Sequence, residues 1–149
     1  MEYKIREACV EDIDSICGLL FQLFEQEVEF IPNLQLQKRG VREIVSNPQL
    51  GKILVIESEH TVIGSVSLLF TISTALGGKV AILEDLIIDK AFRGNGLGKD
   101  LLAAAMKAAK SQDCLRITLL TDAVNKAAQA LYKQYGFECS TMQPMRLNF

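Results

Sequence analysis

The 149-residue sequence contains a single histidine, His60, and this scarcity excludes whole classes of mechanism. A histidine-rich metal site is ruled out, and a Ser-His-Asp or Cys-His system would have to use this one side chain. His60 lies in a polar stretch between two apolar runs, where a hairpin turn in solvent is the simplest interpretation. We therefore expect chemistry that depends neither on imidazole nor on a metal.

The sequence also lacks paired cysteines, long apolar runs and concentrated positive charge. Its cysteines show no CxxC pair and no zinc-ligand spacing. No run of 18 apolar residues predicts a membrane helix, and Met1 leads directly into a polar segment, so we expect a cytoplasmic protein. The net charge is −2 with scattered Lys and Arg, which argues against nucleic acid as the main partner. The cysteines are Cys9, Cys17, Cys114 and Cys139.

Hydrophobic periodicity predicts one α/β domain over residues 1–149. Antiparallel hairpins are expected in the first half, and strand–helix–strand units in the second. Strands are predicted at residues 3–7, 52–57, 62–73, 80–88 and 114–120, with closing strands at 137–140 and 143–147. Helices are predicted at residues 11–27, 34–46, 97–110 and 125–135. The strand at 80–88 is almost wholly apolar, as expected when both faces are covered.

A glycine-rich loop follows that apolar strand and is the most informative segment of the chain. Gly94, Gly96 and Gly98 open the next predicted helix, and Arg93 adds a cation beside them. Glycines let the backbone approach a ligand closely, and the free N–H groups of a helix start attract phosphate. A tight strand-to-helix turn without a ligand would use glycine in the same way.

Two common phosphate-binding motifs do not fit this loop. The dinucleotide fingerprint would need glycine where Lys99 stands. The P-loop would need glycine at Arg93 and Ser or Thr at Asp100. The pattern that remains is Arg-x-x-Gly-x-Gly, with Arg93, Gly96 and Gly98 in the specified positions.

This pattern resembles the pyrophosphate loop of the GCN5-related N-acetyltransferases, the GNAT family. A second motif follows in the expected order: Asn125, and then the run Leu131-Tyr132-Lys133-Gln134-Tyr135-Gly136-Phe137. The resemblance covers residues 80–137, although the family commonly has proline where Lys90 stands. It implies an α/β GNAT fold with a mixed central sheet, an antiparallel first half, a splayed parallel strand pair at the cofactor site and about four helices.

The resemblance implies a single N-acetyltransferase domain that uses acetyl-CoA as cosubstrate and no metal. The glycine loop would bind the pyrophosphate, the strand before it would offer backbone groups to the pantetheine arm, and Asn125 would contact the cofactor further along. The loop residues are Arg93, Gly94, Asn95, Gly96, Leu97, Gly98 and Lys99, and the strand residues are Leu86, Ile87 and Ile88.

Tyr132 is the predicted proton donor. It follows Asn125 by seven residues, about two helical turns, so both lie on one helix face. A phenol with a pKa of about 10 can protonate a departing thiolate whose pKa is about 8.5. The alternative is a core tyrosine packed beneath a strand.

Glu84 is the predicted general base, acting through water. Adjacent strand residues point to opposite faces, so Glu84 and Asp85 should not enter the same cleft. Glu84 shares its face with Leu86 and Ile88, where the acceptor amine would arrive. A carboxylate on an apolar strand has a raised pKa, which suits a base near neutral pH, but it could instead cap a backbone group or pair with lysine. A backbone N–H of the splayed strand would stabilise the oxyanion, and no covalent enzyme intermediate is needed.

Substrate recognition is expected at the end of the first helix. Glu27 follows Leu23 by four residues and Phe24 by three, on the apolar stripe, whereas Glu25 and Glu29 point elsewhere. A carboxylate there can bind a cationic amine, although a solvated helix end rich in acids would show the same pattern.

The acceptor is less well specified than the cofactor. The pair Glu84-Asp85 recurs in polyamine acetyltransferases of the family, which adds Asp85 to the predicted substrate-binding residues and favours a small polycationic or aminoglycoside-like amine. The expected partner is a small-molecule amine, with no nucleic acid and no membrane, and a homodimer is allowed for. A protein lysine or N-terminal acetyltransferase and a non-catalytic acyl-CoA sensor are the alternatives.

Overall fold

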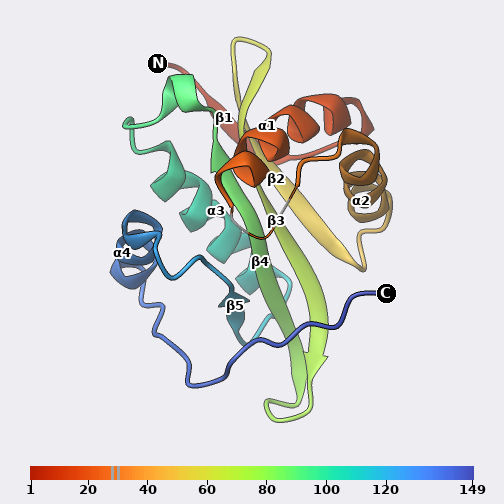
Figure 1. Ribbon diagram of the computed structural model, residues 1–149, viewed down its shortest axis with the longest axis vertical. Helices are drawn as coiled ribbons and strands as arrows, with labels where there is room; N and C mark the ends of the chain where they lie inside the picture. The colour runs from red at the N-terminus through yellow and green to blue at the C-terminus, as the bar shows by residue number, and fades with distance from the viewer. Residues whose placement is uncertain (28, 30) are drawn as a thin grey trace.

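A computed structural model of the protein describes residues 1–27, 29 and 31–149 and shows one five-stranded sheet with helices on both faces (Figure 1). The strands are ordered as in the sequence: β1 (Lys4–Glu7), β2 (Gly51–Ser58), β3 (Thr61–Ser73), β4 (Gly78–Ile88) and β5 (Ile117–Leu119). The α-helices are α1 (Ile13–Gln26), α2 (Leu34–Ser46), α3 (Leu97–Ser111) and α4 (Lys126–Gln134), with 3-10 turns η1 (Val10–Asp12) and η2 (Lys90–Phe92). No helix in the described part of the chain is long and apolar enough to cross a membrane.

The first four strands form an antiparallel meander, as the hairpin signals predict. The turn between β2 and β3 consists of Glu59 and His60, both with positive φ. A two-residue turn of this kind matches the twist of the flanking strands. The His60 side chain is fully exposed, so the prediction of a solvent-exposed turn residue is confirmed.

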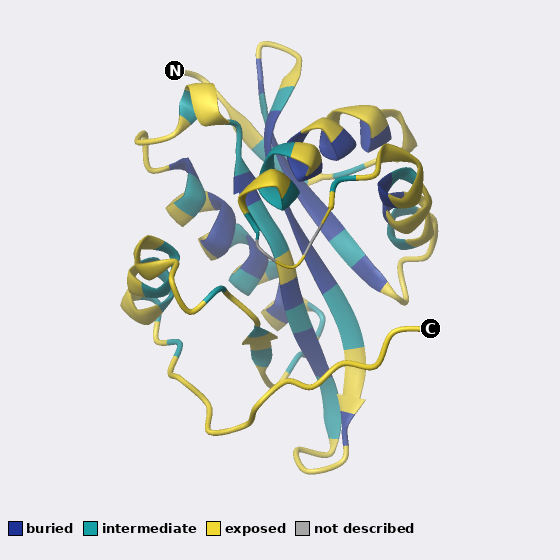
Figure 2. Cartoon of the chain, viewed as in Figure 1, coloured by how far each residue is buried: buried dark blue, intermediate teal, exposed yellow. Residues whose placement is uncertain are grey.

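The sheet buries two apolar clusters, one on each face, which Figure 2 shows in dark blue along the strands and the inward sides of the helices. One cluster packs α3 against β2, β3 and β4, with Leu101, Leu102 and Ala105 fully buried. The other packs α1 and α2 over β2, centred on Ile16 and Val55. Burial on both faces explains why the central strands read as continuous apolar runs.

β4 contains a β-bulge at its centre. Ser67 of β3 lies opposite Glu84, whereas Ser65, two residues away, lies opposite Ile87. Two residues of β4 therefore face a single residue of β3, which is the definition of a bulge. Asp85 is the first of the two, and its φ of 57° lies in the left-handed region, which aspartate and asparagine adopt more readily than other non-glycine residues.

β4 and β5 run parallel but separate early. Their pairing ends at Leu83 and Leu119, so among the described residues the β5-facing edge of β4 has no strand partner beyond Leu83. The splayed parallel pair predicted for this position is therefore present. The separation opens the sheet at the carboxyl ends of two parallel strands, which is where α/β proteins commonly bind ligands.

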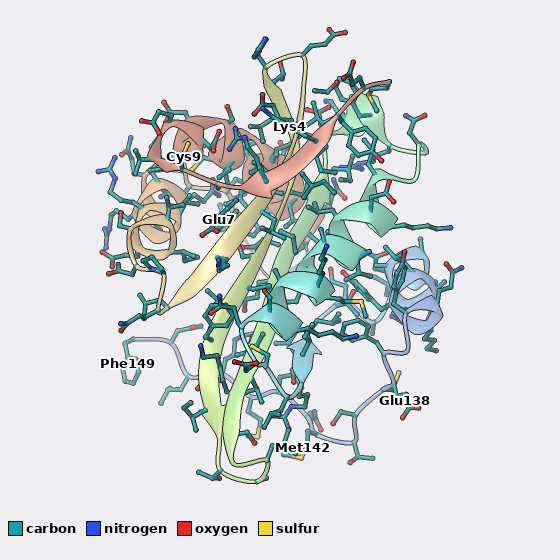
Figure 3. The ribbon with its side chains drawn as sticks, turned by 180° about the vertical axis from the view of Figure 1, so that it is seen from behind. Lys4, Glu7, Cys9, Glu138, Met142 and Phe149 are labelled. Atoms are coloured by element: carbon teal, nitrogen blue, oxygen red, sulfur yellow. The ribbon has the colours of Figure 1, made fainter. Side chains whose placement is uncertain are left out.

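Three of the element predictions were wrong in detail. The first helix ends at Gln26 and is preceded by η1, β5 is shorter than the predicted 114–120, and residues 137–140 and 143–147 form no strands. The C-terminal segment instead crosses the sheet as an extended chain (Figures 1 and 3). Its Met142, Met145, Leu147 and Phe149 are all highly exposed. Alternating apolar residues predict a strand only where a neighbouring strand can accept the hydrogen bonds.

Candidate active site

A cleft with two adjoining halves lies where β4 and β5 separate. The halves share the wall residues Leu23, Gln26, Leu86, Asn125, Ala128 and Tyr132. The loop half, with a volume of about 390 Å³, extends along the end of β4 to the glycine loop. The acidic half, with a volume of about 250 Å³, is bounded by α1, the middle of β4, the chain after β5 and the C-terminal segment.

The glycine loop forms the floor of the loop half. Gly94 and Gly96 have φ of 83° and 78°, and a Cβ atom on either would meet no atom within 4 Å, so the surface beside them is open. Gly96 is the N-cap of α3 and makes no side-chain cap hydrogen bond, and no described side chain is seen to accept from the N–H groups of the first turn. An uncapped helix start beside open backbone is suited to an anion such as pyrophosphate.

Not every loop residue lines this half. Arg93, Gly94, Gly96, Leu97 and Gly98 line it. Two further loop residues do not: the Asn95 amide donates to the carbonyl of Phe92 at 3.0 Å, and the Lys99 carbonyl accepts from the Tyr135 hydroxyl at 3.3 Å. The predicted contacts of Asn95 and Lys99 with a cofactor thus have no support from the shape of the cleft.

Hydrogen bonds to the end of β4 and to α1 hold the loop in place. The Arg93 guanidinium donates from Nε to the carbonyl of Ile88 at 2.9 Å. Gln22 of α1 donates to Asp89 at 3.0 Å and accepts from the backbone N–H of Lys90 at 3.2 Å. The segment between β4 and α3 is thereby tied to the helix that forms the opposite wall of the cleft.

α4 places two predicted residues at the junction of the halves. Asn125 is the N-cap of this helix and accepts from the N–H of Ala128 at 3.1 Å. Tyr132 lies further along the helix, and its ring packs against Phe137 with the ring centroids 5.8 Å apart. Burial raises the pKa of Tyr132, and the charge of Glu27 raises it further. The phenol therefore remains protonated at neutral pH, as a proton donor must.

Five carboxylates and one guanidinium line the acidic half. Among the described residues, four of the carboxylates form no ion pair, and Glu29 alone is paired, with Arg146. The lining acids are Glu27, Glu29, Glu84, Asp85 and Asp122. A concentration of unpaired negative charge in a concave site favours a cationic ligand. No group of three or more described His, Cys, Asp or Glu side chains is arranged to hold a metal ion.

The bulge corrects the geometry predicted for Glu84. Glu84 lies opposite Ser67 of β3, and Ile87 lies opposite Ser65. Residues two apart on a strand point to the same side of the sheet, so the side chains of Glu84 and Ile87 also face one side. Leu86 and Ile88 pack against the apolar cluster on the α3 side instead. Glu84 therefore does not share a face with Leu86 and Ile88, because one inserted residue reverses the alternation.

The same bulge brings Asp85 into the cleft beside Glu84. Both side chains line the acidic half, so the expectation that only one could enter was wrong. Burial raises the pKa of Asp85 to about 7, with further contributions from the charges of Glu84 and Glu27. A carboxyl group that titrates near neutral pH can take a proton from an ammonium group under physiological conditions.

Glu27 lines the acidic half as predicted, but so does Glu29. α1 ends at Gln26 and Glu27 has extended backbone, so helical periodicity no longer describes where Glu29 points. Burial raises the pKa of Glu27, and the charges of Asp122, Glu29 and Glu84 raise it further. Glu27 thus lies at the centre of the acidic group.

Besides Glu29, two further charged residues of the lining, Asp122 and Arg146, were not predicted. Asp122 lies three residues after the end of β5, and an acid close to the carboxyl end of a strand parallel to β4 was a usable signal for it. Arg146 lies in the extended C-terminal segment, where no local pattern indicates that a side chain will reach a site formed mainly by other elements.

Comparison with known proteins agrees with this geometry. The acetyltransferase (GNAT) family model matches residues 16–137. The uncharacterised N-acetyltransferase YhfO of Bacillus subtilis is 30% identical over 138 residues, which cover 93% of this chain and 91% of that one. The chain belongs to the acetyltransferase (GNAT) family. The family, the fold class and the enzyme class predicted from the sequence are thereby confirmed.

Solved structures share the whole fold. Glucosamine-6-phosphate N-acetyltransferase from Arabidopsis thaliana superposes with a TM-score of 0.77 at 26% identity, covering 99% of both chains. A predicted acetyltransferase from Clostridium acetobutylicum, determined with acetyl-CoA, superposes with a TM-score of 0.82 at 22% identity, covering 99% of this chain and 96% of that one.

Proposed function

We propose that this protein transfers the acetyl group of acetyl-CoA to the nitrogen of a small cationic amine. The observation that carries the proposal is the acidic half of the cleft, which adjoins the loop half and is lined by four carboxylates that have no ion-pair partner among the described residues. A cationic ligand is attracted strongly to such a site, because water screens the charge of partly buried carboxylates less than that of exposed ones.

The loop half has the features that a CoA thioester requires. The uncapped start of α3 and the open surface at Gly94 and Gly96 suit the pyrophosphate, and the unpaired edge of β4 suits the amide groups of the pantetheine arm. Arg93 can neutralise part of the phosphate charge. The bound thioester supplies the activated acetyl group. The Clostridium acetobutylicum structure with acetyl-CoA supports the same ligand here.

In this proposal Asp85, rather than Glu84, is the general base. The ammonium group of the substrate first loses a proton to Asp85, directly or through water. The neutral nitrogen then forms a bond to the acetyl carbon as the carbon–sulfur bond breaks, and its second proton passes to water. Tyr132 donates a proton to the departing sulfur and is reprotonated by solvent. The products are the acetylated amine, CoA with a free thiol and one proton.

Small molecules are the favoured acceptors. The glucosamine-6-phosphate N-acetyltransferases from Arabidopsis thaliana and, at 31% identity over 98 residues, from Trypanosoma brucei brucei are named for a small amine. A protein acceptor is the competing reading, since a ribosomal-protein alanine N-acetyltransferase of Bacillus subtilis is 26% identical. The cytoplasmic location, the homodimer and the absence of a nucleic-acid partner stay predictions.

Release of free thiol from acetyl-CoA tests the function. We expect release that depends on a small cationic amine and that rises with amine concentration to saturation. Peptides with free N-termini or lysines are the matched alternatives, and acetylation of a peptide but of no small amine would overturn the proposal. Binding of acetyl-CoA without release in the presence of any amine would identify a sensor.

A further inference from the structure

One ion pair joins two lining residues of the acidic half. Nη1 of Arg146 donates to both carboxylate oxygens of Glu29, at 2.9 Å and 2.8 Å. The two residues are 117 positions apart, Glu29 just after α1 and Arg146 in the C-terminal segment. Both line the acidic half, so the protein places a cation of its own inside the site proposed for cationic substrates.

Arg146 is the only cationic side chain among the described residues that line this half. Its side chain is 47% exposed and that of Glu29 is 52% exposed. Ion pairs with this much exposure contribute little to stability and exchange readily with solvent. The pair is therefore weak enough for another cation to replace Arg146 at Glu29.

The acids of the half are distributed beyond a single ammonium site. Asp85 and Glu84 lie on β4, beside the junction with the loop half, whereas Glu29 and Asp122 lie on the two loops that follow α1 and β5. Glu27 interacts electrostatically with members of both groups. One ammonium group near Asp85 leaves the carboxylate of Glu29 without a substrate partner.

We propose that Glu29 belongs to a second ammonium subsite, which Arg146 occupies in the free protein, and that the substrates are diamines or longer polyamines. One amino group of the substrate is acetylated beside Asp85 and Tyr132, while the distal ammonium group replaces Arg146 at Glu29. This inference rests on the proposed function. Arg146 is then a specificity-determining residue, because every polycationic substrate must compete with it.

The test compares putrescine with butylamine, which has the same carbon chain but lacks the second ammonium group. For the wild type we expect a higher kcat/KM with putrescine. Arg146→Gln should lower the KM for putrescine by about two- to fivefold, the change that corresponds to the free energy of a partly exposed ion pair. The KM for butylamine should change by less than about twofold. Glu29→Gln should raise the KM for putrescine alone. In the Glu29→Gln background, Arg146→Gln should have no further effect.

Arg42→Gln is the control, because Arg42 is exposed on α2 and its loss changes the net charge equally. The inference fails if Arg146→Gln raises the KM for putrescine, if it changes both amines equally, or if its effect persists without Glu29. A requirement for Arg146 with glucosamine 6-phosphate but not with glucosamine would show that Arg146 binds an anionic substrate group instead.

Calorimetric titration of putrescine separates this inference from the proposed function. Without turnover, we expect Arg146→Gln to bind putrescine more tightly than the wild type does, and Glu29→Gln to bind it more weakly. If that order holds but neither amine causes thiol release, the subsite stands and the transfer reaction is wrong. If both amines cause thiol release with equal kcat/KM, and the three proteins bind putrescine equally, the transfer reaction stands and the subsite is wrong.

Discussion

Asp85 occupies the left-handed backbone conformation of the bulge, and its pKa of about 7 follows from burial and from the neighbouring charges of Glu84 and Glu27. The acid that titrates in the working range is thus the one that the bulge turns into the cleft. If Asp85 is the base, kcat/KM must rise as the pH increases through about 7, because only the ionised carboxylate accepts a proton.

Two substitutions distinguish Asp85 from Glu84 as the base. Asp85→Asn should lower kcat/KM by about 100-fold or more and remove the acidic limb of its pH profile. Glu84→Gln should keep the limb but move it to lower pH, because it removes one of the negative charges that raise the pKa of Asp85. Loss of the limb in Glu84→Gln would instead assign the base to Glu84. Asparagine tolerates the left-handed conformation, so unchanged Tm in Asp85→Asn serves as the folding control.

Tyr132→Phe tests the proton donor. The ring contact with Phe137 is retained and only the hydroxyl is lost, so folding and CoA binding should be preserved while kcat falls by about 10- to 1000-fold. Steady-state kinetics and a CoA titration give the two quantities. Normal turnover would show that Tyr132 serves only in packing.

The junction of β4, the glycine loop and α3 forms the proposed cofactor site at the scale of elements. Gly96 requires its left-handed φ, so a side chain there strains the loop whether or not a ligand binds. Gly98 is different. It lies in the first turn of α3, and a Cβ there would meet Ile88 and Leu131 at 3.9 Å, an ordinary contact.

Gly98 therefore allows a matched pair of variants. Gly98→Ala should fold with an equal or higher Tm, since alanine favours a helix by up to about 1 kcal/mol over glycine. Gly98→Asp should also fold, because an acid suits the first turn of a helix. Added CoA should raise the Tm of the wild type and of Gly98→Ala, but not of Gly98→Asp, whose carboxylate repels the pyrophosphate. Equal protection of Gly98→Asp would place the pyrophosphate elsewhere.

At the scale of the whole molecule, Arg6 joins the N-terminal edge strand to the rest of the sheet. Its guanidinium donates to both carboxylate oxygens of Asp12, at 2.7 Å and 2.9 Å, and to Glu57 at 2.6 Å. Asp12 is only 6% exposed. Arg6 holds the pKa of the Asp12 carboxyl well below its usual value. The resulting stabilisation is present above about pH 4 and is lost as the pH falls further.

Asp12→Asn should lower the free energy of unfolding by about 2–4 kcal/mol, because it removes the buried one of the two carboxylates that pair with the partly buried Arg6 guanidinium. Asp14→Asn is the control: Asp14 pairs with Lys38, but its side chain is 81% exposed, so a loss within about 0.5 kcal/mol is expected. Denaturant unfolding at neutral pH measures both. Equal losses in the two variants would show that the Arg6 network contributes no more than a surface pair.

Most elements of the fold were predictable because each rests on local chemistry. The apolar stripe of α1, the N-cap Asn125 of α4 and the apolar run of β3 are properties of residues close together in the chain. The glycine loop was predictable for the same reason, since a helix start and its glycines occupy one short segment. The shared cleft lining of Asn125 and Tyr132 likewise follows from helical spacing.

The acceptor side was decided by tertiary structure. A single inserted residue in β4 reversed which side chains face the cleft, and periodicity alone gives no signal for one extra residue in an otherwise apolar strand. The pKa of Asp85 depends on burial and on charges brought from α1 as well as from its own strand. Arg146 reaches Glu29 from 117 positions away, and contacts at that distance exist only after the sheet has assembled both loops around the cleft. Local sequence thus determined the glycine loop of the proposed cofactor site, while long-range packing determined which charges line the acidic half.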